Sequence, residues 1–377
     1  MNSLDPRSLI AMGALMTVLM TAILVLLRRH YPPHIRGLGD WAAASSVWLL
    51  ASFLFGCRGQ LPASWAMVLA NSLLLQGAIF YCMGCRRFYG HVRQWRLWAA
   101  VLLAETLAFS WFTYARPSFG MQLVVITASM LGTYGATLYF LLRHGDRRLP
   151  QHLVELVLGL HMAVLVLRLV TASAGHSGDN LLQPSLYQNL YVGSYVLTVL
   201  LLTVGAVLMA SDRLTREMEY LASHDPLTQA LNRRALAQRG AQELSRSQRH
   251  GHALALMMID LDHFKQVNDH HGHLHGDAVL QHFARQAKAQ LRRADTLGRW
   301  GGEEFMVLLP ETNQAQAQAT AARIHAALAQ GHALDCQLSI GLATWQVGED
   351  SLDAMIARAD AALYLAKEQG RNRTCTL

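Results

Sequence analysis

The stretch that decides the fold of the C-terminal half is Arg299-Trp300-Gly301-Gly302-Glu303-Glu304-Phe305-Met306-Val307-Leu308-Leu309-Pro310. It reads as two short strands joined by a tight turn, because Gly301 and Gly302 tolerate positive φ and leave space beside the backbone for a ligand. Glu303 and Glu304 follow at the start of the second strand, where successive side chains point to opposite faces. One carboxylate can therefore enter a site while the other supports it or faces solvent.

A second stretch, residues 253–261, is an apolar run that ends in carboxylates. The pattern predicts a buried central strand with Asp260 at its mouth. If this strand pairs with the hairpin, a hairpin carboxylate can face Asp260. Paired carboxylates and a backbone carbonyl form an oxygen-rich site that suits Mg²⁺, whose remaining ligands are usually waters and substrate phosphates.

These motifs, with others in a fixed order, resemble the GGDEF family, the diguanylate cyclases. The run 301–305 matches the family signature, and the resemblance covers roughly residues 215 to 377. The other matching motifs are His224-Asp225-Pro226-Leu227-Thr228, Asn232-Arg233-Arg234, Asp260-Leu261-Asp262-His263-Phe264-Lys265, Asn268-Asp269, Gly272-His273, Gly276-Asp277, Ser339-Ile340-Gly341, Ala359-Asp360-Ala361-Ala362-Leu363-Tyr364, Ala366-Lys367 and Gly370-Arg371-Asn372.

The resemblance implies an α+β domain with a central antiparallel sheet of the ferredoxin-like kind, like the palm of nucleotidyl cyclases and polymerases. The residue pattern of this half alternates helices and strands in agreement with that class. It predicts helices over 232–250, 277–291, 313–329 and 351–368, a helical turn over 264–269, and strands over 253–261, 296–309 and 334–345. Ser351 is the predicted N-cap of the last helix.

The family's reaction joins two GTP molecules into cyclic di-GMP and releases two pyrophosphates. By resemblance, Asp260, Glu303 and the backbone carbonyl of Leu261 should hold Mg²⁺, with Mn²⁺ as a possible substitute. Glu303 is also the implied proton acceptor, and Glu304 is expected to support a second metal ion. Such ions neutralise triphosphate charge and activate the attacking hydroxyl.

Asn268 and Asp277 should read guanine, because an Asp accepts from the guanine N1–H and exocyclic amine. The further substrate contacts implied by the resemblance are Phe264, Lys265, His273, Gly301, Gly302, Lys367 and Arg371. Lys265, Lys367 and Arg371 should hold phosphates. His270, His271 and His275 are expected to lie on an exposed loop, with a zinc site as the alternative.

Arg292 and Asp295 form an R-x-x-D sequence five residues before Gly301. That placement resembles the family's product-inhibition site, where the arginine binds a guanine or phosphate of cyclic di-GMP. The alternative is a surface ion pair.

The first half of the chain has a different composition. Overall, 52% of residues are hydrophobic and the mean hydropathy is +0.20, and the excess lies before residue 211. The net charge of +7 comes largely from arginines in loops between apolar segments, so membrane topology explains it better than a nucleic-acid partner, which we do not expect. Five cysteines form no disulfide framework, and Cys82 and Cys85 are more plausible as small helix residues than as a metal or redox pair.

Seven apolar segments are long enough to cross a bilayer as helices, with 41–56 the shortest. They lie at 8–27, 41–56, 63–83, 95–115, 120–142, 152–174 and 187–210. Loops after the first, third and fifth segments hold Arg28, Arg29, Arg36, Arg86, Arg87, Arg93, Arg96, Arg143, Arg147 and Arg148, whereas the alternate loops hold only Arg58 and Arg116. This bias predicts an N-terminus outside and a cytoplasmic C-terminal domain at a bacterial inner membrane.

Three ionisable residues, Glu105, His161 and Arg168, sit inside apolar segments, where charges usually face a partner or a cavity. His161 and Arg168 are seven apart and share one helix face. We expect Glu105 to pair with one of them and to line a ligand or proton site. The alternative is a purely structural ion pair.

Residues 205–224 are expected to continue the last membrane helix. Val207, Leu214 and Leu221 are spaced by seven, and Met218 follows Leu214 by four, as in a short seam of a parallel coiled coil. A plain amphipathic helix is the alternative. The predicted organisation is therefore a sensor region over 1–210, a connector over 211–224 and a GGDEF domain over 225–377.

Taken together, the sequence predicts a membrane-bound, homodimeric diguanylate cyclase that lipid surrounds and that its product inhibits. We expect it to act in signalling that controls biofilm formation. Two other classes stay open. One is a domain that binds cyclic di-GMP without turnover, and the other is a transporter or receptor with an idle tail.

Overall fold

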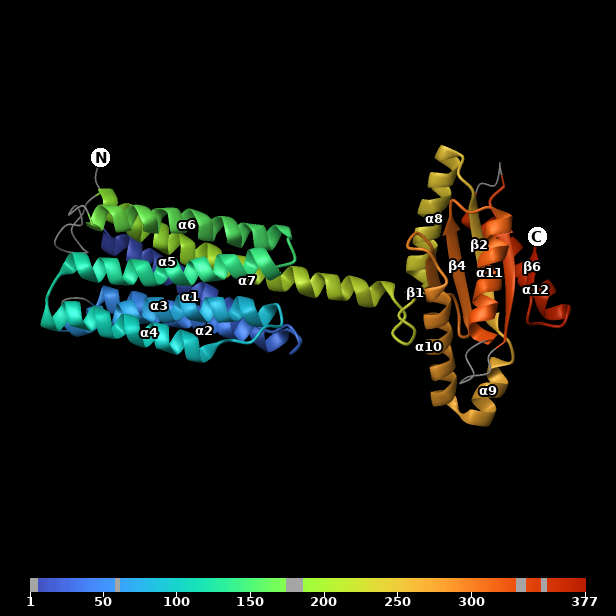
Figure 1. Ribbon diagram of the computed structural model, residues 1–377, viewed down its shortest axis with the longest axis horizontal. Coiled ribbons are helices and arrows are strands. Elements are labelled where there is room, and N and C mark those ends of the chain that lie inside the picture. The colour runs from blue at the N-terminus through green and yellow to red at the C-terminus, as the bar shows by residue number, and fades with distance from the viewer. Residues whose placement is uncertain (1–5, 58–61, 174–185, 330–336, 347–350) are drawn as a thin grey trace. The chain divides into compact units, whose positions relative to one another are not determined.

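The computed structural model describes residues 6–57, 62–173, 186–329, 337–346 and 351–377 (Figure 1). It divides into two compact units, Met1–Arg216 and Glu217–Leu377. Each unit has its own hydrophobic core.

The first unit consists of helices that run back and forth side by side (Figure 1). They are α1 (Pro6–His30), α2 (Leu38–Gly56), α3 (Ala63–Phe88), α4 (Trp95–Ser110) with the π-helical turn Trp111–Ala115, α5 (Phe119–His144), α6 (Leu149–Ser173) and α7 (Leu186–Ser223). Within the described residues, seven helices are long and apolar enough to cross a membrane. The predicted seven-helix region is confirmed, and the short segment 41–56 lies inside α2.

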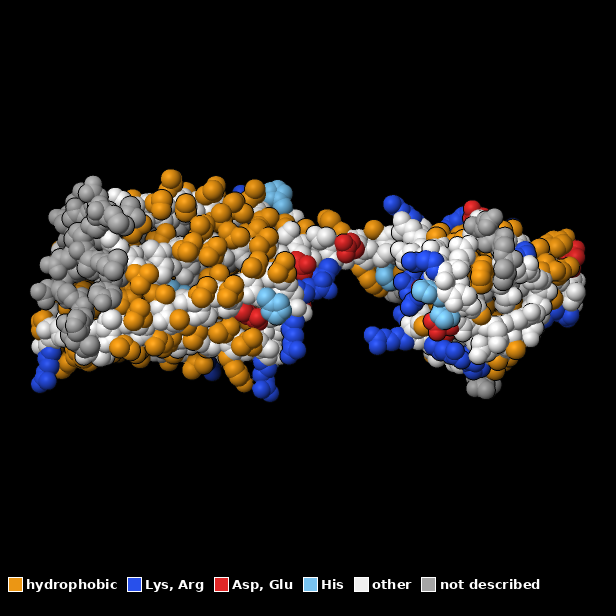
Figure 2. Space-filling model, turned by 90° about the horizontal axis from the view of Figure 1, so that it is seen from above, with side chains coloured by type: hydrophobic (Ala, Val, Ile, Leu, Met, Phe, Trp, Pro, Cys, Tyr) orange, Lys and Arg blue, Asp and Glu red, His pale blue; other side chains and the backbone are white. Residues whose placement is uncertain are grey.

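The outer surface of this unit is rich in large apolar side chains. The largest fully buried side chains include Trp41, Trp48 and Tyr81, whereas Leu19 and Leu107 on the outside are each about 60% exposed (58% and 62%). Figure 2 shows hydrophobic side chains covering the sides of the helices, with arginines gathered toward the helix ends. A large exposed apolar surface of this kind is typical of helices that cross a membrane.

The expected pairing of Glu105 with His161 or Arg168 is wrong. Glu105 on α4 instead accepts hydrogen bonds from Ser72 and Thr106, both at 3.4 Å. The reason is the order of the helices, because α4 packs on α3 and α5 whereas α6, which carries His161 and Arg168, packs on α5.

Helix α7 continues without a break to Ser223, as predicted for residues 205–224. The predicted seam is only partly free, because Val207 and Leu214 pack against the core of their own helix unit. Met218 and Leu221 are 59% and 65% exposed. Met218 and Leu221 at the last turn are thus the most open to a partner, and the four-residue seam stays a prediction.

The second unit is an α/β domain with a six-stranded sheet. Its elements are β1 (Leu231–Asn232), α8 (Arg233–His250), β2 (Leu254–Leu261), α9 (Phe264–His271), α10 (His273–Ala289), β3 (Thr296–Arg299), β4 (Glu304–Pro310), α11 (Gln314–Ala329), β5 (Leu338–Thr344), α12 (Leu352–Glu368) and β6 (Thr374–Thr376). The strand order is β1-β3-β4-β2-β5-β6. The four central strands are antiparallel, as expected, but both edge strands pair in parallel, so the sheet is mixed.

Strand β2 is buried along its whole length because it contributes to a core on each face of the sheet. Met257 and Ile259 face the core shared with α10 and α11, whereas Leu256 and Met258 face the core shared with α8 and α12. Helix α12 packs directly on β5. Gly341 permits this close approach, since a side chain at this position would collide with the backbone of α12. This close packing brings the end of α12 near the end of β2.

Element boundaries agree closely with the prediction except at α10, which begins at His273 rather than near residue 277. Gly272, with φ of 80°, separates it from α9. Ser351 is the N-cap of α12, as predicted, and its hydroxyl accepts from the Ala354 N–H at 3.2 Å. The predicted strand over 334–345 is described only from residue 337, and its first residues lie outside the described part.

Candidate active site

The candidate site lies where β2 ends beside the β3–β4 hairpin. Asp260, near the end of β2, is directly opposite Glu304 on β4. Glu303 belongs to the turn just before β4, and its carbonyl accepts from the Leu261 N–H at 3.4 Å. The hairpin turn is thus attached to the end of the central strand, which brings Asp260 and the two glutamates to one corner of the sheet.

Lys367, in the last turn of α12, meets this corner. Its Nζ lies 2.8 Å from Oδ2 of Asp260, whose side chain is 9% exposed. Burial raises the pKa of Asp260 above its ordinary value, although Lys367 and Arg371 oppose the shift. Burial and then the charge of Asp260 likewise raise the pKa of Glu303. The two carboxylates therefore repel each other here, and the Lys367 ammonium offsets part of that repulsion.

Asp262, two residues beyond Asp260, has a structural role. Its carboxylate accepts hydrogen bonds from the Ser339 hydroxyl at 2.9 and 3.1 Å and from the Asn372 N–H at 3.0 Å. Arg371 and Asn372 adopt left-handed backbone angles, with φ of 61° and 46°. Asp262 thus holds the strained loop after α12 against the sheet, next to the residues expected to bind phosphate.

Helices α9 and α10, which follow β2 in the chain, carry the residues that we expect to bind guanine. Phe264 is buried, whereas Asn268 is half-buried and Asp277 is exposed. A side chain at Gly276 would collide with the Asn268 amide, so the missing Cβ lets the two helices meet there. The arrangement leaves the polar groups of Asn268 and Asp277 on neighbouring turns. Lys265 and His273 lie exposed on the same two helices.

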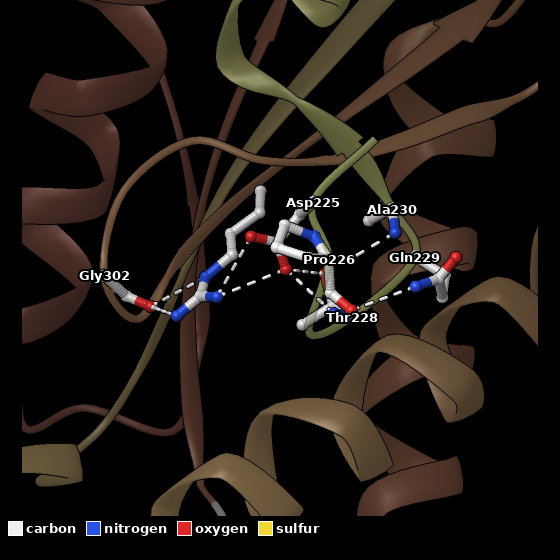
Figure 3. Close-up of polar contacts among 7 residues, drawn as sticks. Asp225, Pro226, Thr228, Gln229, Ala230 and Gly302 are labelled. Atoms are coloured by element: carbon white, nitrogen blue, oxygen red, sulfur yellow. Dashed lines mark hydrogen bonds and ion pairs between the residues drawn. The ribbon is translucent and has the colours of Figure 1, made fainter. Parts of the chain in front are cut away.

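Behind the hairpin turn, Arg299 connects two segments far apart in the sequence. Its Nε and Nη2 donate to the Gly302 carbonyl at 3.0 and 2.7 Å, and its Nη1 donates to both carboxylate oxygens of Asp225 at 3.2 Å. Asp225 also accepts from the N–H and hydroxyl of Thr228 at 2.8 and 2.7 Å. Figure 3 shows this guanidinium between Asp225 and Gly302, with Thr228 beside Asp225. The side chain of Arg299 therefore links the turn after α7 to the Gly301–Gly302 turn through hydrogen bonds.

We expect Arg299→Ala to lower the free energy of unfolding of the second unit by about 1–2 kcal/mol, because the half-buried Asp225 carboxylate and the Gly302 carbonyl lose a charged donor. Urea titration of a fragment covering residues 211–377 measures this. Arg285→Ala, at an exposed position on α10, is the matched control and should change stability by less than about 0.5 kcal/mol. Equal stability of the two variants would contradict a supporting role for Arg299.

The same contact should depend on pH. Burial opposes ionisation of Asp225, but the Thr228 and Arg299 hydrogen bonds prevail and lower its pKa below the ordinary 3.8. The stabilisation by Asp225 should therefore be complete above about pH 3.8 and disappear as the pH falls through the lower value of the folded state. In Asp225→Asn this part of the acid sensitivity should be missing, as acid titration of the same fragment would measure.

Arg292 and Asp295 lie away from this corner, on the turn between α10 and β3. The Asp295 carboxylate accepts from the Arg292 N–H at 2.8 Å, so it fixes the turn and leaves the Arg292 side chain exposed. The two residues line a cavity of about 460 Å³. Its other basic lining residues are His224, Lys288 and Arg293.

The structure thus brings Asp260, Glu303, Glu304, Lys367 and Arg371 to one corner, with Gly301 and Gly302 in the adjoining turn. Asn268, Asp277, Phe264, Lys265 and His273 lie on the neighbouring helices, and Arg292 and Asp295 line a separate cavity. Sequence reasoning missed the roles of Asp225, Asp262 and Arg299, although all three lie within or beside the matched motifs. For Asp262 a signal was available in the sequence, because side chains alternate along a strand and Asp260 and Asp262 therefore point to the same face.

Comparison with known proteins finds relatives of this part of the chain. Residues 222–373 match the family model described as "Diguanylate cyclase, GGDEF domain". Diguanylate cyclase DgcP of Pseudomonas aeruginosa is 43% identical over 155 residues, which are 40% of this chain and 23% of that protein. Diguanylate cyclase DgcM of Escherichia coli is 38% identical over 181 residues, which are 46% of this chain and 43% of that protein.

Among solved structures, the GGDEF domain of DgcB from Caulobacter crescentus in complex with c-di-GMP is 30% identical, with a TM-score of 0.39. The match covers 41% of this chain and 93% of that one. The chain spans less than half the length of the two curated relatives.

Fold and site together define an α/β domain with an acidic corner next to the cationic side chains of Lys367 and Arg371, preceded by a bundle of apolar helices. Through residues 222–373, the chain belongs to the GGDEF family.

Proposed function

We propose that the protein is a diguanylate cyclase that condenses two GTP molecules into cyclic di-GMP. The single observation that carries the proposal is the meeting of Asp260, Glu303 and Lys367 at the end of β2. The family match and the names of the curated relatives support the same reaction. In each of two steps, a 3′-hydroxyl oxygen bonds to the α-phosphorus of the other nucleotide, and pyrophosphate leaves.

The donor set at this corner fits a divalent cation such as Mg²⁺ or Mn²⁺. The carboxylates of Asp260 and Glu303 and the Leu261 carbonyl would hold it, because they are hard oxygen donors and the two carboxylates repel each other without a cation. When bound, the ion would neutralise phosphate charge and acidify the attacking hydroxyl. Glu303 accepts the proton of that hydroxyl, and Glu304 supports the site from the opposite position on β4.

Lys367 neutralises Asp260 in the described structure, and we infer that its ammonium turns to phosphate oxygens when the substrate is present. Arg371 is held beside it by the loop that Asp262 anchors, and Lys265 is the third phosphate-binding cation. Asn268 and Asp277 read guanine, Phe264 and His273 flank the nucleotide, and Gly301 and Gly302 let the triphosphate approach the backbone.

One domain holds one GTP, so activity requires two domains facing each other. The exposed Met218 and Leu221 at the end of α7 provide a short apolar contact for a homodimer. The arginine distribution supports an N-terminus outside and residues after 210 in the cytoplasm, where GTP is found. The membrane would then be the bacterial inner membrane, and lipid would surround the seven helices.

We also propose that cyclic di-GMP binds at the cavity lined by Arg292 and inhibits the enzyme. The exposed guanidinium and neighbouring Lys288 and Arg293 make this cavity basic, which suits a ligand with two phosphates.

We expect Arg292→Ala to raise the product concentration needed for half-inhibition by about tenfold or more, the loss of roughly one strong charge-assisted contact. Initial rates measured over a series of cyclic di-GMP concentrations test this. Arg246→Ala, at an exposed position of α8, should leave inhibition unchanged. Inhibition that survives in Arg292→Ala would remove this site from the account.

The experiment that tests the function is incubation of the full-length protein, reconstituted in lipid, with GTP and Mg²⁺. We expect cyclic di-GMP and two pyrophosphates per product, and no cyclic product from ATP. Binding of cyclic di-GMP without any turnover would instead favour a binding module.

A further inference from the structure

The helix bundle contains a cavity lined by an arginine, Arg168, that has no carboxylate partner among the described residues. The cavity has a volume of about 90 Å³ and lies between α1, α2, α3, α5, α6 and α7. Apolar side chains such as Ile10, Phe55 and Ile126 form much of its wall. A mostly apolar wall with few polar groups is typical of a site for a small organic molecule.

The polar groups at this cavity include two donors without a partner. Nε of Arg168, on α6, is buried and has no hydrogen-bond partner among the described residues, and neither has the hydroxyl of Tyr195 on α7. Both residues also line an adjoining cavity of about 30 Å³, together with His161. Buried donors are nearly always satisfied, so two of them at one cavity indicate a missing acceptor.

The guanidinium of Arg168 also lacks a counter-charge within the described chain. Its central carbon lies 5.5 Å from the ring centroid of Tyr191, a cation–π contact that neutralises no charge. Each carboxylate of the described part of this unit bonds elsewhere. Asp40 binds Arg87 and Arg93, Glu105 binds Ser72 and Thr106, Glu155 binds Gln151 and His152, and Asp146 and Asp212 bind Arg216.

We propose that this cavity binds a small aliphatic carboxylate of about two to four carbons in all. A carboxylate presents two acceptors that match the arginine fork, and Tyr195 supplies a further donor. The volume sets the size, since 90 Å³ corresponds to roughly three water-sized groups. The apolar wall accommodates the short chain.

The position of the cavity indicates where the ligand enters. Arg168 is five residues from the end of α6, about 7.5 Å along the helix axis. The remaining lining residues include Gln188 in the first turn of α7. The ligand would therefore enter from the end of the bundle where α6 ends and α7 begins, which is the external end in the proposed topology.

Binding at the cavity can affect the residues that follow the bundle, because α7 is continuous from Leu186 to Ser223. Tyr191, Val192 and Tyr195 of α7 line the cavity, and Arg213 of the same helix donates to the Phe88 carbonyl at 2.7 Å. A ligand that orders the start of α7 can thus bias the helix that leads into the GGDEF domain. This makes the carboxylate a candidate for the signal.

The test is isothermal titration of the full-length protein in phosphatidylcholine nanodiscs with acetate, propionate and butyrate. We expect saturable one-to-one binding that weakens at least tenfold in Arg168→Gln and several-fold in Tyr195→Phe, and that partly persists in Arg168→Lys. Arg143→Gln, an exposed arginine at the end of α5, should bind like the wild type. The corresponding uncharged amides should not bind. These readouts are independent of cyclase activity.

Two further arms identify the occupant. Phosphatidylglycerol in the nanodiscs should leave the affinity unchanged, whereas a tenfold loss would assign the site to an anionic lipid headgroup. Asp179→Asn, at a position outside the described residues, should also bind unchanged, whereas tighter binding would mean that the chain fills its own site. The absence of saturable binding in the wild type, or equal affinity in Arg168→Gln with the wild-type melting temperature, would overturn the proposal.

Discussion

Replacing Glu303 with glutamine should lower the rate of cyclic di-GMP formation by about a thousandfold, the loss expected when one residue serves as both proton acceptor and metal ligand. Glutamine keeps the shape and one oxygen, but it carries no charge and cannot take the proton of the 3′-hydroxyl. Burial and then the charge of Asp260 raise the pKa of Glu303, which makes Glu303 a better proton acceptor than an ordinary carboxylate. Initial rates with saturating GTP and Mg²⁺ measure the loss.

Glu311→Gln is the matched control, because Glu311 is an exposed carboxylate in the turn after β4. It should retain nearly the full rate. GTP binding by Glu303→Gln, measured with excess Mg²⁺, should fall much less than the rate does. If the Glu303 variant kept even a tenth of the wild-type rate, Glu303 could not be the proton acceptor.

Replacing Asp262 with alanine should lower the free energy of unfolding of the second unit by about 3 kcal/mol, because it leaves buried donors without their charged acceptor. Asp262 is 6% exposed and accepts from Ser339 and from the Asn372 backbone. The loop with Arg371 would also lose its attachment to the sheet. We therefore expect weaker GTP binding even at temperatures where the variant stays folded.

Urea titration of the 211–377 fragment measures the stability change, and Asp269→Ala, an exposed carboxylate on α9, provides the control. Ser339→Ala removes one donor only and should cost about 1 kcal/mol. A loss in Asp262→Ala no larger than that in Asp269→Ala would show that the carboxylate does not anchor the loop.

Much of the second unit could be predicted because its local signals agree with its fold. The apolar run that ends at Asp260 has the length and composition of a central strand, and the structure places it between β4 and β5. Ser351 marks the start of α12 through its side chain alone. The edge strands β1 and β6 were missed because two or three residues carry no periodicity.

The contacts that join distant segments could not be read from the sequence. No spacing rule relates Asp225 to Arg299 or Asp262 to Asn372, since each pair meets only when the sheet is assembled. The pairing of Glu105 was predicted wrongly for a related reason, because the order of helices around the bundle decides which polar groups can meet. Likewise, the spacing of Val207 and Leu214 indicated an apolar stripe but not which surface covers it.

The most direct test of the central claim is to locate the cation. Crystals of the second unit grown with Mn²⁺ and a GTP analogue that cannot lose pyrophosphate would show the ion by anomalous scattering. The account predicts a peak about 2.0–2.2 Å from carboxylate oxygens of both Asp260 and Glu303, with Lys367 moved from Asp260 to a phosphate. Bound nucleotide with Mn²⁺ elsewhere, and Lys367 still paired with Asp260, would contradict it.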